Sequence, residues 1–354
     1  MYHSFTIKNF RCFHDLTLEP LERVNLIAGK NNVGKTALLE ALWLHVGVNT
    51  PDLPLRLNML RSGQTLADVV EVWGWMFFDK QVQNVIQLAS QSEDGAGRTM
   101  RVSVAQPKEF HQPPGNGGAE SASPVGSLTT ATGPGELLLD YQDTTGQHGA
   151  SRAFLTSEGI KFERMRLSQT PLSVFLSPHV RALTDDVARF SQLEAVGRQG
   201  EVLGALQRLE PRLRRLAILI KGATPQIYGD IGLSELTPLS LMGEGMGRLL
   251  SVLLSIANTP GGVILVDEIE NGLHHSALTG LWAAVADAAR RAGAQVFAPT
   301  HSWECIRAAH EAFAASGTYD FRLHRLDRIG EDVRAVNFDQ KRLAVAEATD
   351  LEVR

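Results

Sequence analysis

A glycine-rich turn near the N-terminus constrains the fold of this chain more than any other feature. It reads Gly29-Lys30-Asn31-Asn32-Val33-Gly34-Lys35-Thr36 and has the spacing G-x-x-x-x-G-K-[ST], known as Walker A. An apolar run, Val24 to Ala28, precedes the turn, and a second one, Ala37 to Val46, follows it. A strand, a glycine-rich turn and a helix in this order point successive backbone N–H groups at an anion. The alternative is a plain turn that happens to end in Gly-Lys-Thr.

The motif assigns roles to its side chains. Lys35 is expected to reach the β- and γ-phosphates of a nucleotide, and the hydroxyl of Thr36 to take a Mg²⁺ position. The backbone of Gly29 to Gly34 is expected to cradle the phosphates.

Two adjacent carboxylates end a later apolar run. Asp267 and Glu268 follow Val263 to Val266, in the manner of a Walker B motif. A buried parallel strand delivers such groups to the sheet edge where ligands bind. We expect Asp267 to hold Mg²⁺, directly or through water, and Glu268 to orient or deprotonate the attacking water. Taken alone the pair could be a solvated turn, but both motifs predict the same site.

A histidine follows the next predicted strand. His301 comes after Gln295 to Ala298, through Pro299 and Thr300. At a neighbouring strand end it could bond the γ-phosphate, whereas a histidine at a loop edge is the plainer alternative.

The wider pattern predicts an α/β fold of the P-loop NTPase type, with a mixed sheet and antiparallel strands at the N-terminus. We expect the core to comprise 1–50 and 170–354. A β-rich lobe is expected at 51–169, with a flexible loop at 106–135 that is rich in Gly, Pro, Ser and Thr.

Two regions invite a more local interpretation. Pro211 is predicted to open a helix whose solvated face carries a basic cluster, with a nucleic-acid or partner contact as the alternative. An aromatic group is predicted to pack in the core under the lobe. The cluster is Arg212, Arg214, Arg215 and Lys221, and the aromatic group is Trp73, Trp75, Phe77 and Phe78.

Composition argues against several classes of protein. The formal net charge of -5 gives no support to general DNA binding, although DNA stays possible as a partner. No apolar run approaches the roughly 18 residues of a membrane span, and no secretion signal opens the chain. We therefore expect a cytoplasmic protein whose thiols, Cys12 and Cys305, are reduced. The adjacent His274 and His275 do not suggest a metal site.

Four segments together resemble the ABC-type ATPase heads of the RecF, SMC and OLD group, and within it the small bacterial "AAA family" ATPases related to OLD nucleases. They are the opening Phe5 to Phe13, the Walker A turn, the run Asp267 to His274 and the triplet Thr300-His301-Ser302. The last two resemble the family's D-loop and switch histidine.

The resemblance implies that ATP is clamped between two heads in a homodimer. The segment Met242 to Arg248 stands where the family places its signature, so the backbone of Gly243 and Gly245 is expected at the partner's γ-phosphate. Here Gly-Glu-Gly replaces the usual Ser-Gly-Gly. Neither Gln192 nor Gln199 stands out as the family's Q-loop glutamine.

The family's nucleases carry a Toprim domain after the head, and no such segment is expected here, so a nuclease or other effector is expected to be a separate subunit. The favoured function is an ATP-hydrolysing, ATP-dimerised switch in DNA maintenance or phage defence. The alternatives are a nucleotide-binding scaffold with negligible turnover and the ATPase subunit of a transporter.

Overall fold

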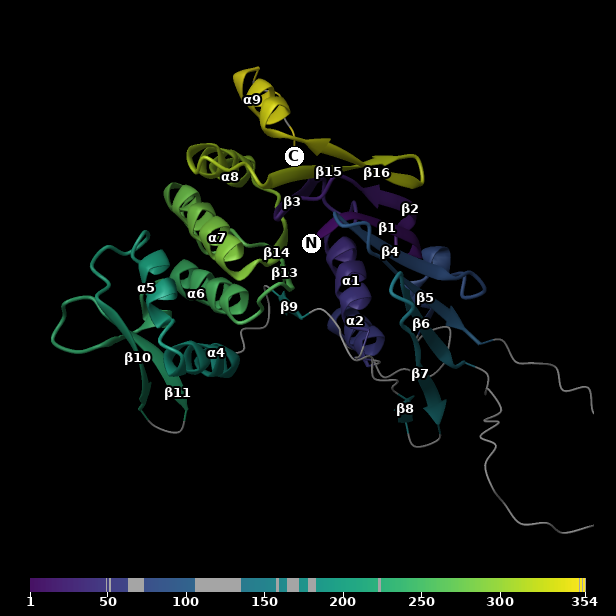
Figure 1. Ribbon diagram of the computed structural model, residues 1–354, viewed down its shortest axis with the longest axis horizontal. Coiled ribbons are helices and arrows are strands. Elements are labelled where there is room, and N and C mark those ends of the chain that lie inside the picture. The colour runs from purple at the N-terminus through teal and green to yellow at the C-terminus, as the bar shows by residue number, and fades with distance from the viewer. Residues whose placement is uncertain are drawn as a thin grey trace, which may run out of the picture.

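The computed structural model describes residues 1–48, 50, 52–62, 73–105, 135–156, 159–163, 172–177, 183–221, 224–349, 351 and 353. Its strands form three sheets (Figure 1). The seven-stranded antiparallel sheet has the order β2 (Phe13–Leu18), β1 (Tyr2–Phe10), β4 (Ile86–Ser92), β5 (Gly97–Val104), β6 (Leu137–Asp143), β7 (His148–Thr156) and β8 (Gly159–Glu163). The six-stranded sheet has the order β16 (Asp332–Phe338), β15 (Phe321–Ile329), β3 (Val24–Gly29), β14 (Gln295–Pro299), β13 (Val263–Val266) and β9 (Ser173–Leu176). The smallest sheet comprises β10 (Arg215–Ile220), β11 (Pro225–Asp230) and β12 (Thr237–Pro238).

Helices connect and cover these sheets. The α-helices are α1 (Lys35–Val46), α2 (Leu53–Ser62), α4 (Leu183–Ala195), α5 (Gln199–Leu206), α6 (Glu244–Ala257), α7 (Leu278–Ala292), α8 (Trp303–Ala315) and α9 (Gln340–Ala348). The short 3₁₀ helices are η1 (Gly74–Met76), η2 (Phe78–Lys80), η3 (Leu239–Leu241) and η4 (His275–Ala277). Among the helices that the structure describes, none has the length and apolarity that a membrane span requires.

The central strands of the six-stranded sheet are parallel and buried on both faces. Every residue of β3 and of β13 is buried, which explains why both read as unbroken apolar runs. β14 lies between them and pairs in parallel with each. The carboxyl ends of the three strands therefore meet at one edge of the sheet, and this edge carries the functional motifs.

Helix α1 lies between the two large sheets (Figure 1). Its side chains share a hydrophobic core with the antiparallel sheet and with Leu265, Phe297 and Leu326 of the six-stranded sheet. The opposite face of the six-stranded sheet packs against α6, α7 and α8 in a second core. The predicted α/β fold with a mixed sheet is confirmed, and α1 is buried between two layers as its apolar sequence indicated.

The predicted lobe at 51–169 supplies strands to the sheet that begins at the N-terminus. β4 pairs with β1, with Phe5 opposite Ser90, and β5 to β8 extend the same sheet. The predicted flexible loop at 106–135 lies outside the described residues except for Gly135, and the division of the chain into core and lobe stays a prediction.

The predicted helix beginning at Pro211 is wrong. Pro211 lies in a turn, and the following residues form β10, which pairs along its whole length with β11. The basic cluster is largely neutralised locally. Its ion pairs join Arg212 to Glu210, Arg215 to Asp230 and Lys221 to Glu235.

Only part of the aromatic group lies in the core as predicted. Trp73 and Phe77 are 0% and 2% exposed, and Phe78 is partly buried. Trp75 is 56% exposed, so the prediction of core packing is wrong for this residue.

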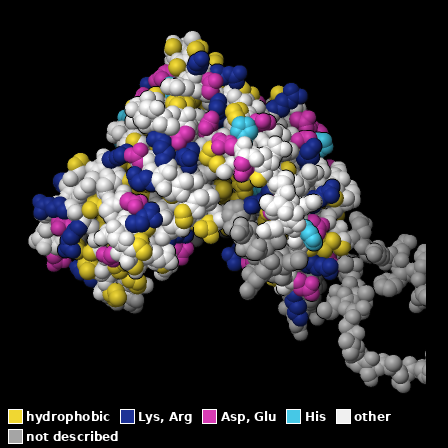
Figure 2. All heavy atoms as spheres, in the orientation of Figure 1, with side chains coloured by type: hydrophobic (Ala, Val, Ile, Leu, Met, Phe, Trp, Pro, Cys, Tyr) yellow, Lys and Arg dark blue, Asp and Glu magenta, His cyan; other side chains and the backbone are white. Residues whose placement is uncertain are grey.

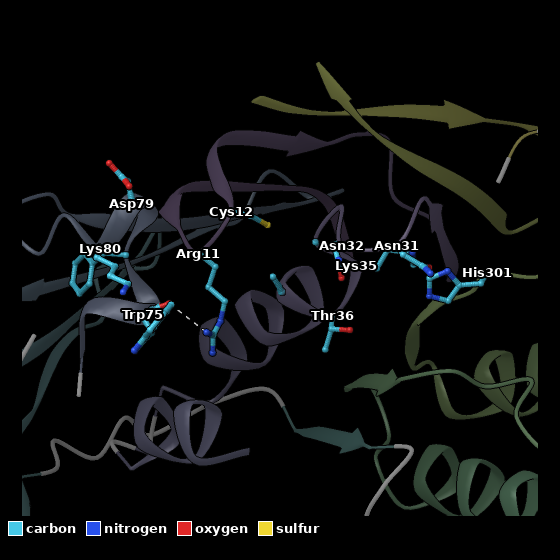
Figure 3. A pocket seen from close by; sticks show the side chains of 13 residues that line it. Arg11, Cys12, Asn31, Asn32, Lys35, Thr36, Trp75, Asp79, Lys80 and His301 are labelled. Carbon is cyan, nitrogen blue, oxygen red and sulfur yellow. Dashed lines mark hydrogen bonds between the residues drawn. The ribbon is translucent and has the colours of Figure 1, made fainter. Parts of the chain in front are cut away.

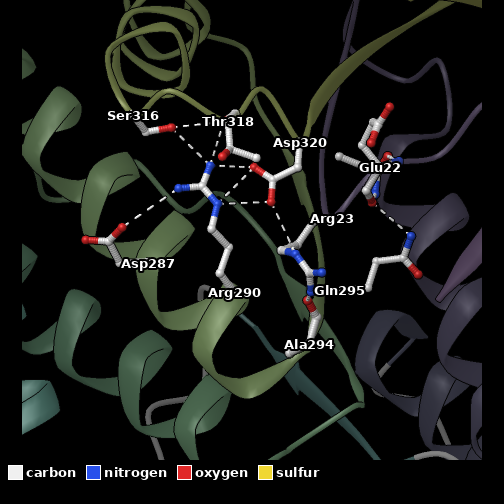
Figure 4. A network of polar contacts seen from close by, with 10 residues as sticks. Glu22, Arg23, Asp287, Arg290, Ala294, Gln295, Ser316, Thr318 and Asp320 are labelled. Atoms are coloured by element: carbon white, nitrogen blue, oxygen red, sulfur yellow. Dashed lines mark hydrogen bonds and ion pairs between the residues drawn. The ribbon is translucent and has the colours of Figure 1, made fainter.

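A polar network ties the amino ends of the core strands to α7 (Figure 4). Arg290, near the end of α7, donates from Nε to both carboxylate oxygens of Asp320 at 3.1 and 3.0 Å and from Nη2 to the Thr318 carbonyl at 2.7 Å. Arg23, just before β3, also pairs with Asp320, at 3.2 Å. The network therefore joins α7, β3 and β15 at the amino ends of the strands, which is the sheet edge opposite the one that carries the motifs.

Candidate functional site

The Walker A turn connects β3 to α1 and depends on two glycines. Gly29 has a φ of 140°, and a Cβ there would lie 2.6 Å from the Leu326 carbonyl oxygen. Gly34 has a φ of 112°, and a Cβ there would lie 2.7 Å from the ring of Phe13. Both the left-handed backbone and the close neighbours require glycine. The strand, turn and helix thus have the arrangement that the sequence predicted.

Lys35 is folded back onto this turn. Its ammonium donates to the carbonyl oxygens of Gly29 at 2.6 Å and Lys30 at 3.0 Å. Burial lowers the pKa of Lys35 to about 8, and the charges of Asp267, Glu270 and Glu268 oppose that shift. A buried cation facing three carboxylates is placed to exchange its carbonyl contacts for a polyanionic ligand.

Asp267 directly follows β13. The hydroxyl of Thr36, in the first turn of α1, lies near enough to the Asp267 carboxylate to lower its pKa. Burial raises the pKa of Asp267 to about 6, the charge of Glu268 adds to the rise, and the Arg248 guanidinium opposes it. Arg248 also donates to the backbone carbonyls of Asp267 and, at 3.1 Å, Ser177, so it fixes the position of the strand end.

These residues fit a Mg²⁺ ion. A carboxylate and a hydroxyl are the hard oxygen donors that Mg²⁺ prefers, and the charge of the adjacent Glu268 raises the cost of ionising Asp267. A divalent cation would relieve that repulsion. Thr36 and Asp267 are the two sequence-predicted metal ligands, and the fold brings them close together although 230 residues separate them in the chain.

Glu268 adopts a left-handed backbone, with a φ of 51°, directly after the strand. Its carboxylate accepts a hydrogen bond from the side-chain amide of Asn271. Positive φ at a residue with a long side chain is uncommon, and such residues cluster at functional sites. The carboxylate is half-buried and lies close enough to Lys35 and His301 for its charge to raise the pKa of each.

His301 and the acid loop are joined by a residue that sequence reasoning missed. Glu270 accepts hydrogen bonds from the Thr300 hydroxyl and, at 3.4 Å, from the His301 backbone N–H. Burial raises the pKa of Glu270, and these two hydrogen bonds oppose the rise. Burial also lowers the pKa of His301, with Lys35 as a further cause. The signal was present in the repeated acids of Asp267-Glu268-Ile269-Glu270.

The signature segment lies against the D-loop of the same chain. Gly243 caps α6 with a φ of 116° and has open space around it. At Gly245 a Cβ would lie 2.8 Å from the Gly272 carbonyl oxygen, so glycine is required there for packing. The trans phosphate contact of both glycines stays a prediction. Gln192 lies on α4 and Gln199 begins α5.

A cavity of about 960 Å³ opens beside the Walker A turn (Figure 3). One end is formed by the turn and by His301, and the other by the turn between β1 and β2 and by the segment of η1 and η2. Its lining comprises Asn31, Asn32, Gly34, Lys35, Thr36, Ala37 and His301 at the first end and Arg11, Cys12, Trp75, Phe77, Asp79 and Lys80 at the second. The sequence had predicted the first end and had not associated the second with it.

Two family models match the chain. One, described as "AAA ATPase domain", matches residues 1–85, and another, described as "AAA domain, putative AbiEii toxin, Type IV TA system", matches residues 136–306. The first contains the Walker A turn, and the second contains the acid pair and His301.

Individual proteins are similar over different lengths. An "ATP/GTP phosphatase" of Helicobacter pylori is 22% identical over 328 residues, which cover 86% of each chain. An uncharacterised protein of Methanocaldococcus jannaschii is 52% identical over 44 residues, or 12% of this chain and 20% of that one.

Among solved structures, an SMC head bound to the C-terminal winged-helix domain of ScpA has the same fold. The TM-score is 0.52 at 11% identity, with 97% of this chain and 99% of that chain covered. The chain is thus similar to AAA-type ATPases along two separate segments and has the fold of an SMC head.

Proposed function

We propose that the protein is a nucleotide-driven switch, in which two heads dimerise around ATP and separate after hydrolysis. The observation that carries this proposal is the closeness of the phosphate-binding turn to the acid pair, since the charges of Asp267 and Glu268 raise the pKa of Lys35 and the Thr36 hydroxyl lowers that of Asp267. It joins the phosphate-binding turn to the acid pair in one site, and Lys35 lies close to both.

The proposed chemistry divides between the two motifs. The turn and Lys35 bind the β- and γ-phosphates, while Thr36 and Asp267 hold Mg²⁺, which neutralises phosphate charge when bound. Glu268 takes the proton of the attacking water, and its left-handed backbone lies just after β13. His301 contacts the γ-phosphate from the end of β14. Glu270 accepts hydrogen bonds from Thr300 and His301, so a movement of His301 on loss of the γ-phosphate changes the position of the acid loop.

Gly243 and Gly245 are proposed to contact the nucleotide held by the partner head. The open space around Gly243 and the position of both glycines at the start of α6 support this role, since helix N-termini bind anions. The packing of Gly245 on Gly272 supports a coupling between the signature and the D-loop.

The cellular role that we propose is phage defence or DNA maintenance in the cytoplasm, with a separate effector such as a nuclease. The toxin–antitoxin description of one matching family model supports the defence role. Basic and acidic side chains are interspersed on the face shown in Figure 2. With a net charge of -5 this surface favours a protein effector over DNA as the first partner.

Replacing Glu268 with Gln tests the switch. Loss of a general base lowers kcat by about 100-fold or more, whereas the nucleotide contacts are kept. The expected result is an ATP-dependent dimer of Glu268→Gln in size-exclusion chromatography with light scattering, and a monomer without ATP. Glu235→Gln is the matched control, because this carboxylate is exposed and pairs only weakly with Lys221. Equal turnover by Glu268→Gln and wild type would remove the proposal.

A second candidate is a scaffold that binds nucleotide with negligible turnover. Two observations favour it. The Asn271 amide donates a hydrogen bond to the Glu268 carboxylate, and the signature contains the acidic Glu244. Rapid hydrolysis by the purified protein alone excludes this candidate. Retention of bound ATP without hydrolysis supports it.

A further inference from the structure

An exposed tryptophan stands at the end of the cavity opposite the Walker A turn (Figure 3). Trp75 is 56% exposed, although Trp73 and Phe77 on either side of it are buried. The ammonium of Lys80 lies 3.5 Å from the centroid of its ring. A large aromatic side chain kept in solvent at a cavity wall is a binding surface more often than a packing element.

The backbone beside Trp75 is held in an unusual shape. Asp79 and Lys80 are consecutive residues with positive φ, 50° and 55°, and neither is glycine. Each such residue costs free energy, so the surrounding contacts must impose the conformation. It brings the Lys80 side chain back over the indole and leaves the Asp79 carboxylate exposed at the cavity wall.

Arg11 fixes this segment to the helix that begins with Lys35. The Arg11 backbone N–H donates to the Met76 carbonyl at 2.8 Å, and the guanidinium donates to the Trp75 carbonyl at 3.3 Å. The same guanidinium pairs with Glu40 of α1 at 2.5 Å, and both side chains are nearly buried. The tryptophan and the phosphate-binding turn are therefore held on one rigid frame, at opposite ends of one cavity.

We propose that Trp75 is the stacking surface for the base of the bound nucleotide, with a purine as the preferred ring. This inference rests on the proposed nucleotide site, because the triphosphate at the Walker A turn directs the rest of the molecule along the cavity. Stacking of a base on an aromatic ring is stronger than an exposed cation–π contact, so the base displaces Lys80 from the indole. The freed ammonium and the Asp79 carboxylate then face the polar edge of the base.

If Trp75 stacks on the base, the affinity for ATP has two separable contributions, one from the phosphates and one from the base. Inorganic tripolyphosphate has the phosphates and lacks the base, so it engages the Walker A turn alone. Trp75→Ala should weaken ATP binding about tenfold and leave tripolyphosphate binding unchanged. Trp75→Phe keeps an aromatic face and should bind ATP within about threefold of wild type. Because Trp75 is exposed, both variants should unfold at the wild-type temperature.

Isothermal titration of wild type, Trp75→Ala and Trp75→Phe with ATP and with tripolyphosphate tests the inference. It is overturned if Trp75→Ala binds ATP as wild type does, or if it loses affinity for both ligands equally. Wild type that binds neither ligand contradicts the proposed function itself. Wild type that binds both ligands, with no effect of the tryptophan, contradicts only the stacking.

Discussion

Burial shifts the pKa values of Lys35 and Asp267 in opposite directions, and in each case it destabilises the charged form. The pKa of Lys35 falls to about 8 and that of Asp267 rises to about 6. Neither residue finds full compensation from its neighbours in the described part of the chain. A site with these properties is suited to a ligand that brings both negative phosphate and a positive metal ion.

The buried imidazole of His45 sets a pH dependence of stability. It lies fully buried on α1 and is hydrogen-bonded to Ser90 at 2.9 Å. Burial, and then the charge of Arg98, lowers the pKa of His45 to about 3. The unfolded chain protonates this group below about pH 6.5, while the folded chain does not. Its contribution to stability is therefore complete above that pH and is lost as the pH falls towards about 3.

His45→Gln should remove this dependence. Between about pH 6 and pH 4, the free energy of unfolding of wild type should fall more steeply than that of the variant, by about 1.4 kcal/mol per pH unit. Urea denaturation at a series of pH values measures both slopes. Parallel slopes would show that His45 is protonated equally in the folded and unfolded chains.

Among the contacts between elements, the hydrogen bonds of Arg290 join α7 to the segment that precedes β15 in the core sheet. Arg290→Ala should lower the free energy of unfolding by about 2 kcal/mol, because it removes hydrogen bonds to Asp320 that are partly shielded from water and an exposed one to Thr318. Arg23 continues to neutralise Asp320, which limits the loss.

Arg291→Ala is the matched control from the same helix turn. Its side chain is 45% exposed and lies 3.8 Å from a Glu201 oxygen, so its removal should cost less than about 0.5 kcal/mol. Urea denaturation of both variants gives the comparison. Equal losses would mean that the network of Figure 4 contributes no more than an exposed ion pair.

The elements that sequence patterns predicted are those whose burial is decided locally. Four elements, β3, α1, β13 and β14, are buried along almost their whole length, and their sequences are correspondingly apolar. Glycines mark the turn between β3 and α1. β10 was mistaken for a helix, because pairing with β11 overrides the preference of Pro211 and its neighbours.

The sequence predicted the residues of the candidate site that belong to motifs, and it did not predict the residues that hold them in place. Lys35, Thr36, Asp267 and His301 follow from spacing at strand ends. Glu270 was missed, since its contact with Thr300 depends on how two loops fold over the sheet edge. Trp75 was expected in the core and is exposed, and the contact of its carbonyl with Arg11, which pairs with Glu40, is one that no local pattern reveals.

At the scale of the whole molecule, the parallel sheet assembles one site from the two ends of the chain. Two family models that match separate segments, residues 1–85 and 136–306, each supply one half of it. The order of strands places β14 between β3 and β13, so His301, which follows β14, comes from the strand between those that carry the phosphate-binding turn and the acid pair. We expect the two halves to bind a single Mg²⁺-nucleotide together.

The dependence of ATP affinity on Mg²⁺ in Asp267→Asn tests whether the two halves share one Mg²⁺-nucleotide. Isothermal titration with ATP, with and without Mg²⁺, should show that the metal strengthens binding to wild type. The neutral amide of the variant cannot ligate Mg²⁺ as a carboxylate does, so Mg²⁺ should change the variant's affinity by less than about threefold. Asp267→Asn that gains as much from Mg²⁺ as wild type does would contradict a metal site shared between Thr36 and Asp267.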